Sequence, residues 1–208
     1  MDTTQQHEQR PIITLAGDKI ALGPPHRGIL PLWAQWDNDL ALSILSGDPA
    51  RPRTLESTEA EYDLYSKGEQ RDWVLFVMYE RATLRPIGIV ELTEINLAHR
   101  TALFGIRIGE ADCWGHGYGT EATMLMLDYA FNALGLHNIM LDPFAFNERA
   151  IRAYQKAGFK LVGHRRQAHR IGDRAYDVVL MDCLSSEFHS ALPRVIEAPA
   201  LPHQENIP

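Results

Sequence analysis

The sequence predicts an α/β fold built on one central sheet that is mixed but mostly antiparallel. Three observations lead to this prediction: a series of strand-like runs in the first half, a glycine-rich loop between a strand and a helix, and a strand, helix and hairpin after it. Because a sheet must bury its apolar faces, this order favours a single sheet flanked by helices. The 208 residues, of which 45% are hydrophobic, suffice for one domain with its own core.

The first half of the chain contains the strand-like runs and two helical stretches. A strand is expected near Ile12–Leu22, followed by helices around Leu30–Leu45 and Thr58–Lys67. The second helix opens with Thr58-Glu-Ala-Glu61, a pattern typical of a capping box. Three further strands, separated by turn-forming or charged residues, suit an antiparallel meander. They are Trp73–Tyr79, Pro86–Ile95 and Thr101–Ile108.

The second half changes character at a glycine-rich loop, Gly115–Gly119. A helix is expected from Thr120 to about Leu134, because apolar residues recur there at helical spacing, and a strand follows at His137–Asp142. Asn147 can cap a second helix, which Gly158 would end. The chain then closes with a hairpin. Its strands are Leu161–His169 and Ala175–Cys183, and its turn is Gly172-Asp173.

Composition narrows the class of protein. The net charge of -7, without a block of five or more like charges, counts against nucleic-acid binding. No apolar run approaches the ~18 residues of a membrane span, and Met1–Arg10 lacks the apolar stretch of a signal peptide. We therefore expect a cytoplasmic protein with no membrane contact, in which Cys113 and Cys183 stay reduced. Residues 1–10 are expected to be a polar tail, 11–188 the domain, and 189–208 a flexible tail rich in Pro and Ala.

Metal chemistry is not expected. The nine histidines are scattered, without an H-x-x-x-H or H-E-x-x-H pair, and the two cysteines lack metal-ligand spacing.

The strongest local signal is the segment Trp114-Gly-His-Gly-Tyr-Gly-Thr-Glu121. Glycines let backbone N–H groups converge, and the start of a helix adds partial positive charge, so the segment suits a pyrophosphate. It lacks the Gly-Lys-Ser/Thr ending of nucleoside-triphosphate loops, and its spacing is not G-x-G-x-x-G. A tight turn that binds nothing is the competing interpretation.

A second signal lies in Asn147–Phe159. On a helix capped by Asn147, Ala150 and Tyr154 share one face because they are four residues apart. The structural alternative is an N-cap, a packed aromatic ring and a terminating glycine.

Together the two segments resemble the GNAT superfamily of acetyltransferases, and the resemblance covers about Ile12 to Phe188. The first looks like the family's Gln/Arg-x-x-Gly-x-Gly/Ala loop, here Trp114-x-x-Gly117-x-Gly119, and the second like its Asn…Ala…Tyr…Lys…Gly-Phe helix. Trp114 departs from the Gln/Arg of this pattern. A tryptophan at this position, followed by a run like Gly115–Ala122, resembles the branch of ribosomal-protein N-terminal (alanine) acetyltransferases. Gly105-Ile-Arg-Ile-Gly109 also resembles that branch's strand before the loop.

The resemblance implies a GNAT-like domain whose sheet splays apart at a coenzyme cleft. It further implies that acetyl-CoA is the co-substrate and that the acceptor is a primary amine: a protein N-terminus, or a small molecule such as an antibiotic or a polyamine. A non-catalytic sensor of acyl-CoA is the alternative function. Many relatives form dimers, so a homodimer is an open alternative to a monomer.

The same resemblance assigns roles to residues. The backbone of Trp114–Thr120 would hold the pyrophosphate, that of Ile106–Ile108 would follow the pantetheine arm, Asn147 would bond the coenzyme, and Tyr154 would stand near its sulfur. The expected coenzyme-binding residues are Ile106, Arg107, Ile108, Trp114, Gly115, His116, Gly117, Tyr118, Gly119, Thr120, Asn147 and Lys156.

The expected catalytic residues are Tyr154, as proton donor to the departing thiolate, and Glu91, as base. Relatives often carry a glutamate where Leu103 stands, and the nearest substitutes are Glu91 and Glu94. A regular strand puts these two on opposite faces, so at most one faces the cleft. Deprotonation through ordered water is an equal alternative.

Two further features have open interpretations. Trp33 and Trp36 could line the acceptor cleft or pack in the core. The basic run His164–Arg170 could meet a phosphate or an acidic partner, although an exposed hairpin face is the preferred interpretation.

Overall fold

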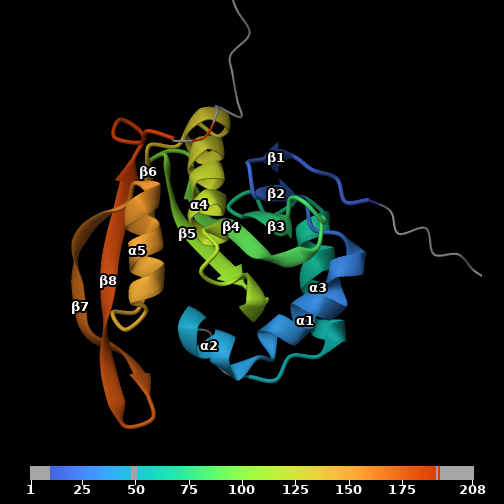
Figure 1. The fold of residues 1–208 in the computed structure, drawn as a ribbon, viewed down its shortest axis with the longest axis horizontal. Coiled ribbons are helices and arrows are strands. Elements are labelled where there is room, and N and C mark those ends of the chain that lie inside the picture. Colours follow the sequence, from blue (N-terminus) through green and yellow to red (C-terminus); the bar gives the residue numbers. More distant parts are fainter. Residues whose placement is uncertain (1–9, 48–50, 191, 193–208) are drawn as a thin grey trace, which may run out of the picture.

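The fold was determined as a computed structural model that describes residues 10–47, 51–190 and 192. It confirms the expected α/β domain: one mixed sheet of eight strands in the order β1-β2-β3-β4-β5-β6-β8-β7, flanked by helices (Figure 1). The predicted tails, 1–10 and 189–208, lie almost entirely outside the described residues.

The strands pair antiparallel except for β5 and β6, which run parallel. The strands are β1 Leu15–Ala16, β2 Ile20–Gly23, β3 Val74–Glu80, β4 Pro86–Asn96, β5 Thr101–Ile108, β6 Asn138–Leu141, β7 Lys160–Ile171 and β8 Arg174–Leu184. The α-helices are α1 Leu30–Asp37, α2 Leu40–Ser46, α3 Leu55–Ser66, α4 Tyr118–Asp128 and α5 Glu148–Ala157. The predicted meander of β3, β4 and β5 and the closing hairpin of β7 and β8 are confirmed.

Alternating side chains of the central strands supply two cores, one on each face of the sheet. Phe76 and Met78 of β3 belong to the core that α4 covers, whereas Leu75 and Val77 belong to the core beside α1. This two-sided burial follows from the period-two geometry of a strand and explains why β3 reads as a continuous apolar run.

The N-terminal elements differ from the prediction. The single strand expected near Ile12–Leu22 is a short hairpin, because the chain turns back after Gly17, whose N–H donates to the Ile20 carbonyl at 2.8 Å. The helix expected over Leu30–Leu45 is two helices: the Asp39 carboxylate accepts the backbone N–H of Ala41 and starts α2 anew.

The prediction of a capping box at Thr58 was also wrong. Helix α3 begins at Leu55, and the hydroxyl of Thr54 caps it by accepting the backbone N–H of Ser57 at 3.2 Å. Thr58 lies inside the helix and is buried. Two threonines four residues apart compete for one cap, and packing of the helix selects the first.

Helix α4 begins at Tyr118, two residues before the expected start, and its N-cap is Gly117. It ends at Asp128, earlier than the expected Leu134, and the chain continues as a π-helical turn, Tyr129–Ala133. The caps predicted for α5 are confirmed: the Asn147 side chain accepts the Ala150 N–H at 3.2 Å, and Gly158 ends the helix.

The sheet opens between β5 and β6. These strands pair only over three residues each, Thr101–Leu103 with Asn138–Met140. Strand β5 continues to Ile108, whereas β6 stops at Leu141 and the following segment bonds to β8 instead: the Pro143 carbonyl accepts the Val179 N–H at 2.8 Å. Pro143 therefore lies just outside the strand, where its missing N–H costs no ladder bond. The divergence leaves one edge of β5 without a neighbouring strand.

Candidate active site

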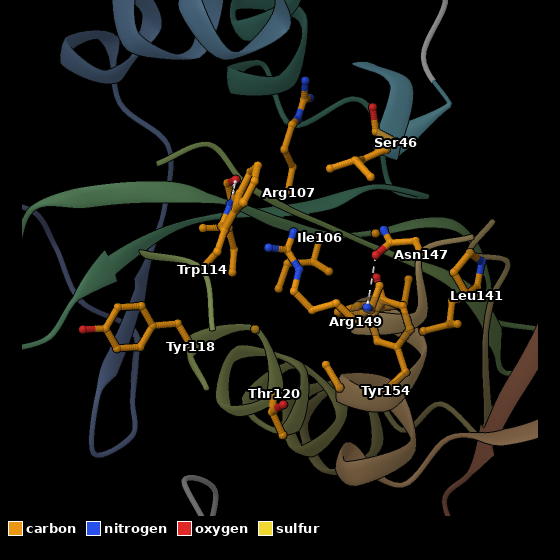
Figure 2. Close-up of a pocket in the computed structure, with 18 of the residues that line it drawn as sticks. Ser46, Ile106, Arg107, Trp114, Tyr118, Thr120, Leu141, Asn147, Arg149 and Tyr154 are labelled. Carbon is orange, nitrogen blue, oxygen red and sulfur yellow. Dashed lines mark hydrogen bonds between the residues drawn. The ribbon is translucent and has the colours of Figure 1, made fainter. Parts of the chain in front are cut away.

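A cleft of about 460 Å³ lies where β5 and β6 diverge. Figure 2 shows side chains from the edge of β5, the first turn of α4 and the loop before it, the first turns of α5, the end of α2 and the end of β6, and Glu91 of β4 also lines the cleft. A concave site at the point where a sheet opens is a common location for a ligand.

The free edge of β5 forms one wall. Within the described part of the chain, Phe104–Ile108 pair with β4 alone, so backbone groups on their other edge face the cleft. The expected residues Ile106, Arg107 and Ile108 all lie here. One of these groups is already used, because the Trp114 indole N–H donates to the Ile108 carbonyl at 3.0 Å. An extended ligand can bond to the remaining groups as an added strand would.

The glycine-rich loop forms the end of the cleft beside α4. Gly115 and Gly117 have φ values of 82° and 84°, a left-handed conformation that side chains disfavour. This turn leads directly into the first turn of α4, where Gly119 and Thr120 also line the cleft. The loop therefore puts a helix N-terminus, with its unpaired N–H groups and partial positive charge, against the cleft.

His116 does not line the cleft, unlike the loop residues on either side of it. Its side chain is exposed, its ring lies beside that of Tyr118, and its carbonyl accepts the Lys19 ammonium at 3.2 Å. The left-handed glycines on both sides turn this one residue outward. Tyr118 does line the cleft, and its hydroxyl donates to Glu80 at 2.7 Å.

Tyr154 projects into the cleft from α5. Its ring makes edge contacts with Phe104 and Phe159, with centroids 6.1 and 6.0 Å away. Burial, assisted by the negative charge of Asp142, raises the pKa of Tyr154 to about 12. The phenol is therefore protonated at neutral pH and can donate a proton. Lys156 lies on the same helix, exposed at the cleft.

Of the two glutamates on β4, only Glu91 reaches the cleft. The Trp73 indole N–H donates to its carboxylate at 2.8 Å, and its strand partner is Gly105. A Cβ at Gly105 would lie 3.0 Å from a Glu91 oxygen, so the glycine makes room for the carboxylate. Glu94 is exposed and has a φ of 50° at a bulge, so the regular alternation assumed from the sequence fails there.

The side chain of Arg107 crosses from the cleft to α1. It pairs with Asp37 at 2.6 Å, and Asp37 also pairs with Arg53 at 3.3 Å. Burial raises the pKa of Asp37, against the opposing effect of the two arginines. This ion-pair cluster connects the cleft wall to the segment between α2 and α3.

Sequence reasoning missed Arg149 and the contribution of α2. Arg149, in the first turn of α5, lines the cleft and stacks on the Trp114 ring, with Cζ 4.3 Å from the ring centroid. Its position two residues after Asn147 could have indicated it. Leu42 and Ser46 of α2 also line the cleft, and no local pattern marks them.

The exposure of Trp33, Trp36 and the basic run His164–Arg170 decides between the alternatives that the sequence left open for them. Trp33 and Trp36 are each 3% exposed in the core beside α1 and do not line the cleft. The basic run His164–Arg170 lies in β7, mostly exposed, and none of it lines the cleft.

No group of three or more His, Cys, Asp or Glu side chains among the described residues could hold a metal ion. None of the helices in those residues is long and apolar enough to cross a membrane.

Comparison with known proteins agrees with this geometry. Residues 21–160 match the acetyltransferase (GNAT) domain family. The chain is 35% identical over 133 residues to spermidine N(1)-acetyltransferase of Vibrio cholerae, which covers 64% of this chain and 76% of the relative. It is 39% identical over 105 residues to the Escherichia coli spermidine N(1)-acetyltransferase, covering 49% and 53%.

A solved structure is also similar. The crystal structure of spermidine N-acetyltransferase from Vibrio cholerae in complex with CoA and spermine superposes with a TM-score of 0.75 at 28% identity, covering 81% of this chain and 97% of that one. The chain therefore belongs to the GNAT acetyltransferase family and is an N-acetyltransferase that transfers the acetyl group of acetyl-CoA to a primary amine.

Proposed function

We propose that the acceptor is a polyamine such as spermidine and that it is acetylated in the cleft between β5 and β6. The similar proteins from Vibrio cholerae and Escherichia coli are named for this substrate. The observation that carries the proposal is the Glu91 carboxylate, which the Trp73 indole orients inside the cleft. A cationic amine loses hydration on entering, and a carboxylate compensates that cost.

The coenzyme would occupy the cleft lengthwise. Its diphosphate would lie on the N–H groups of Gly115–Thr120, and its pantetheine arm along Ile106–Ile108. Asn147 would bond the arm, with Lys156 near the phosphates. The thioester would then lie beside Tyr154, whose ring contacts Phe104 on the same strand edge. Charged phosphates at a helix N-terminus and an extended amide chain at a free strand edge are the arrangements that the exposed backbone groups favour.

Starting from an ammonium, the acceptor nitrogen must lose two protons and the departing sulfur must gain one. The acceptor ammonium gives a proton to Glu91, directly or through water, and the free amine attacks the thioester carbonyl carbon. The carbon–sulfur bond then breaks, the thiolate takes the proton of Tyr154, and the second proton of the nitrogen passes through water to the Tyr154 phenolate. The products are the N-acetylated amine and CoA with a free thiol. Glu91 then releases its proton to solvent, which restores both groups.

A protein N-terminus is the second candidate acceptor. The run from Trp114 to Ala122 favours it, because it resembles the branch of ribosomal-protein N-terminal acetyltransferases. A chain terminus is also a primary amine, but it brings a polypeptide that the end of α2 would have to accommodate. The polyamine is preferred because the acetyltransferases with the stated similarities carry that substrate in their names.

A panel of amines, assayed for thiol release from acetyl-CoA, tests the proposal. We expect saturable release with spermidine and spermine, formation of the monoacetylated product by mass spectrometry, and little release with peptides or aminoglycosides. Release with peptides alone would instead support the N-terminal branch. Binding of acetyl-CoA without release for any amine would support a sensor.

A further inference from the structure

The coenzyme cleft contains an aromatic–cation pair that the glycine loop alone does not explain. Trp114 precedes the loop, and its indole is held in place because its N–H donates to the Ile108 carbonyl at 3.0 Å. Arg149 comes from the other side, and its guanidinium lies 4.3 Å from the centre of the indole ring. Figure 2 shows Arg149 reaching from α5 toward Trp114 in front of Ile106, so the pair spans the cleft.

Arg149 keeps its hydrogen-bonding capacity in this position. A guanidinium stacked on a ring uses its face for the ring and leaves its N–H groups free in its own plane. Within the part of the chain that the structure describes, no carboxylate pairs with Arg149. Arg152, three residues on, is different, because it pairs with Glu148 at 2.9 Å. Arg149 therefore offers an uncompensated fork of donors, which matches the geometry of phosphate oxygens.

The position of Arg149 beside Trp114 indicates which phosphates of the coenzyme it would bind. Trp114 directly precedes Gly115–Thr120, the segment whose N–H groups face the proposed diphosphate site. We propose that Trp114 is a platform that holds Arg149 over the glycine loop, and that Arg149 binds the coenzyme diphosphate from the side opposite the backbone N–H groups. Arg149 is then a coenzyme-binding residue and Trp114 a positioning residue. The inference rests on the proposed placement of acetyl-CoA.

The test compares affinities for CoA and for dephospho-CoA, which lacks the 3′-phosphate but keeps the diphosphate, by calorimetry. Arg149→Met should raise both Kd values about tenfold, as loss of a charge-assisted hydrogen bond predicts. The kcat at saturating acetyl-CoA should change less than about twofold, since the interaction concerns binding rather than the reacting atoms.

Variants of Trp114 test the platform. Trp114→Leu should raise both Kd values by about 2- to 10-fold, within the range of a cation–π contact and no more than the loss of Arg149 itself. Trp114→Phe keeps a ring and should recover most of the affinity. The double variant Trp114→Leu/Arg149→Met should bind no more weakly than Arg149→Met alone, because the platform acts only through the arginine. Arg152→Met removes the same charge from the same helix, and at most about a twofold rise is expected, as for an exposed ion pair.

The outcomes that overturn the inference are distinct from failure of the proposed function. Wild-type protein that does not bind CoA would refute the coenzyme site itself. Normal binding by wild type and by Arg149→Met would refute only the role of Arg149. A defect seen with CoA but absent with dephospho-CoA would assign Arg149 to the 3′-phosphate. Additive losses in the double variant, or equal losses for Arg152→Met, would refute the platform.

Discussion

Replacing Tyr154 by Phe removes one hydroxyl and tests the proposed proton donor. The ring contacts with Phe104 and Phe159 remain, and no described residue forms a hydrogen bond with this hydroxyl, so the fold should tolerate the change. We expect the melting temperature to shift by less than about 3 °C, which corresponds to about 1 kcal/mol for a chain of this size.

The pKa of Tyr154 determines whether the phenol holds a proton to donate. With a pKa of about 12, fewer than about one in ten thousand Tyr154 phenols is ionised at pH 7.5. Such a phenol is a weak acid toward a thiolate in water, whose conjugate thiol has a pKa of about 8.5. However, burial raises thiol pKa values as well, as it raises that of Cys183 to about 12. Burial in a dehydrated cleft therefore narrows the gap between the pKa of the departing thiol and that of the phenol, which favours proton donation.

Loss of a positioned acid typically costs about 10²- to 10⁴-fold, so Tyr154→Phe should lower kcat by a factor in this range. The Kd of CoA should stay within about twofold, since the hydroxyl acts on the departing sulfur and not on the bound coenzyme. The assay is thiol release in single turnover with saturating spermidine, in which product release cannot mask the chemical step. A single-turnover rate equal to that of wild type would refute the role of Tyr154, and the thiolate would then leave without an acid.

Three further predictions concern the loop, the fold and its pH dependence. Gly117→Glu should abolish CoA binding, because it puts a negative charge at the phosphate site. Gly117→Ala causes the same backbone strain without the charge, so this variant should bind CoA more tightly than Gly117→Glu does. Equal affinities of the two variants in calorimetry would refute the loop assignment. Glu121→Ala should lower the free energy of unfolding, measured by urea denaturation, by about 2–3 kcal/mol, because this carboxylate accepts the backbone N–H groups of Lys19 and Ile20 at 2.7 and 3.1 Å. Glu121→Gln should lower it less. An unchanged free energy of unfolding in Glu121→Ala would show that water replaces both hydrogen bonds. Burial raises the pKa of Cys183 to about 12, so the contribution of this thiol to stability is complete below its unfolded pKa of about 9 and is lost as the pH rises toward 12. Between pH 8 and 11 the melting temperature should therefore fall less steeply with pH for Cys183→Ala than for wild type. An equal fall for both proteins would contradict the burial of the thiol.

The parts of the fold that the sequence predicted are those with strong local signals. Asn147 and Gly158 mark the two ends of α5 because each solves a hydrogen-bonding problem of the helix terminus itself. Strand β5 was predicted with its observed bounds because apolar residues and turn residues delimit it. These signals need no knowledge of the rest of the chain.

The parts that were missed depend on contacts between distant segments. The choice of Thr54 over Thr58 as a cap follows from the packing of α3, and the break between α1 and α2 follows from a single carboxylate, Asp39. In the site, the stacking of Arg149 on Trp114 joins residues 35 positions apart, which periodicity cannot detect. The outward turn of His116 results from the backbone of the glycines beside it.

The central claim is that acetyl-CoA lies along the free edge of β5, and hydrogen exchange measured by mass spectrometry tests it most directly. Backbone amides of residues 104–108 that do not bond to β4 should exchange rapidly in the free protein and slowly once CoA is bound. Protection should extend to residues 115–120, with β7 unchanged as an internal control. Protection confined to other segments, with exchange at residues 104–108 unaltered by saturating CoA, would contradict the account.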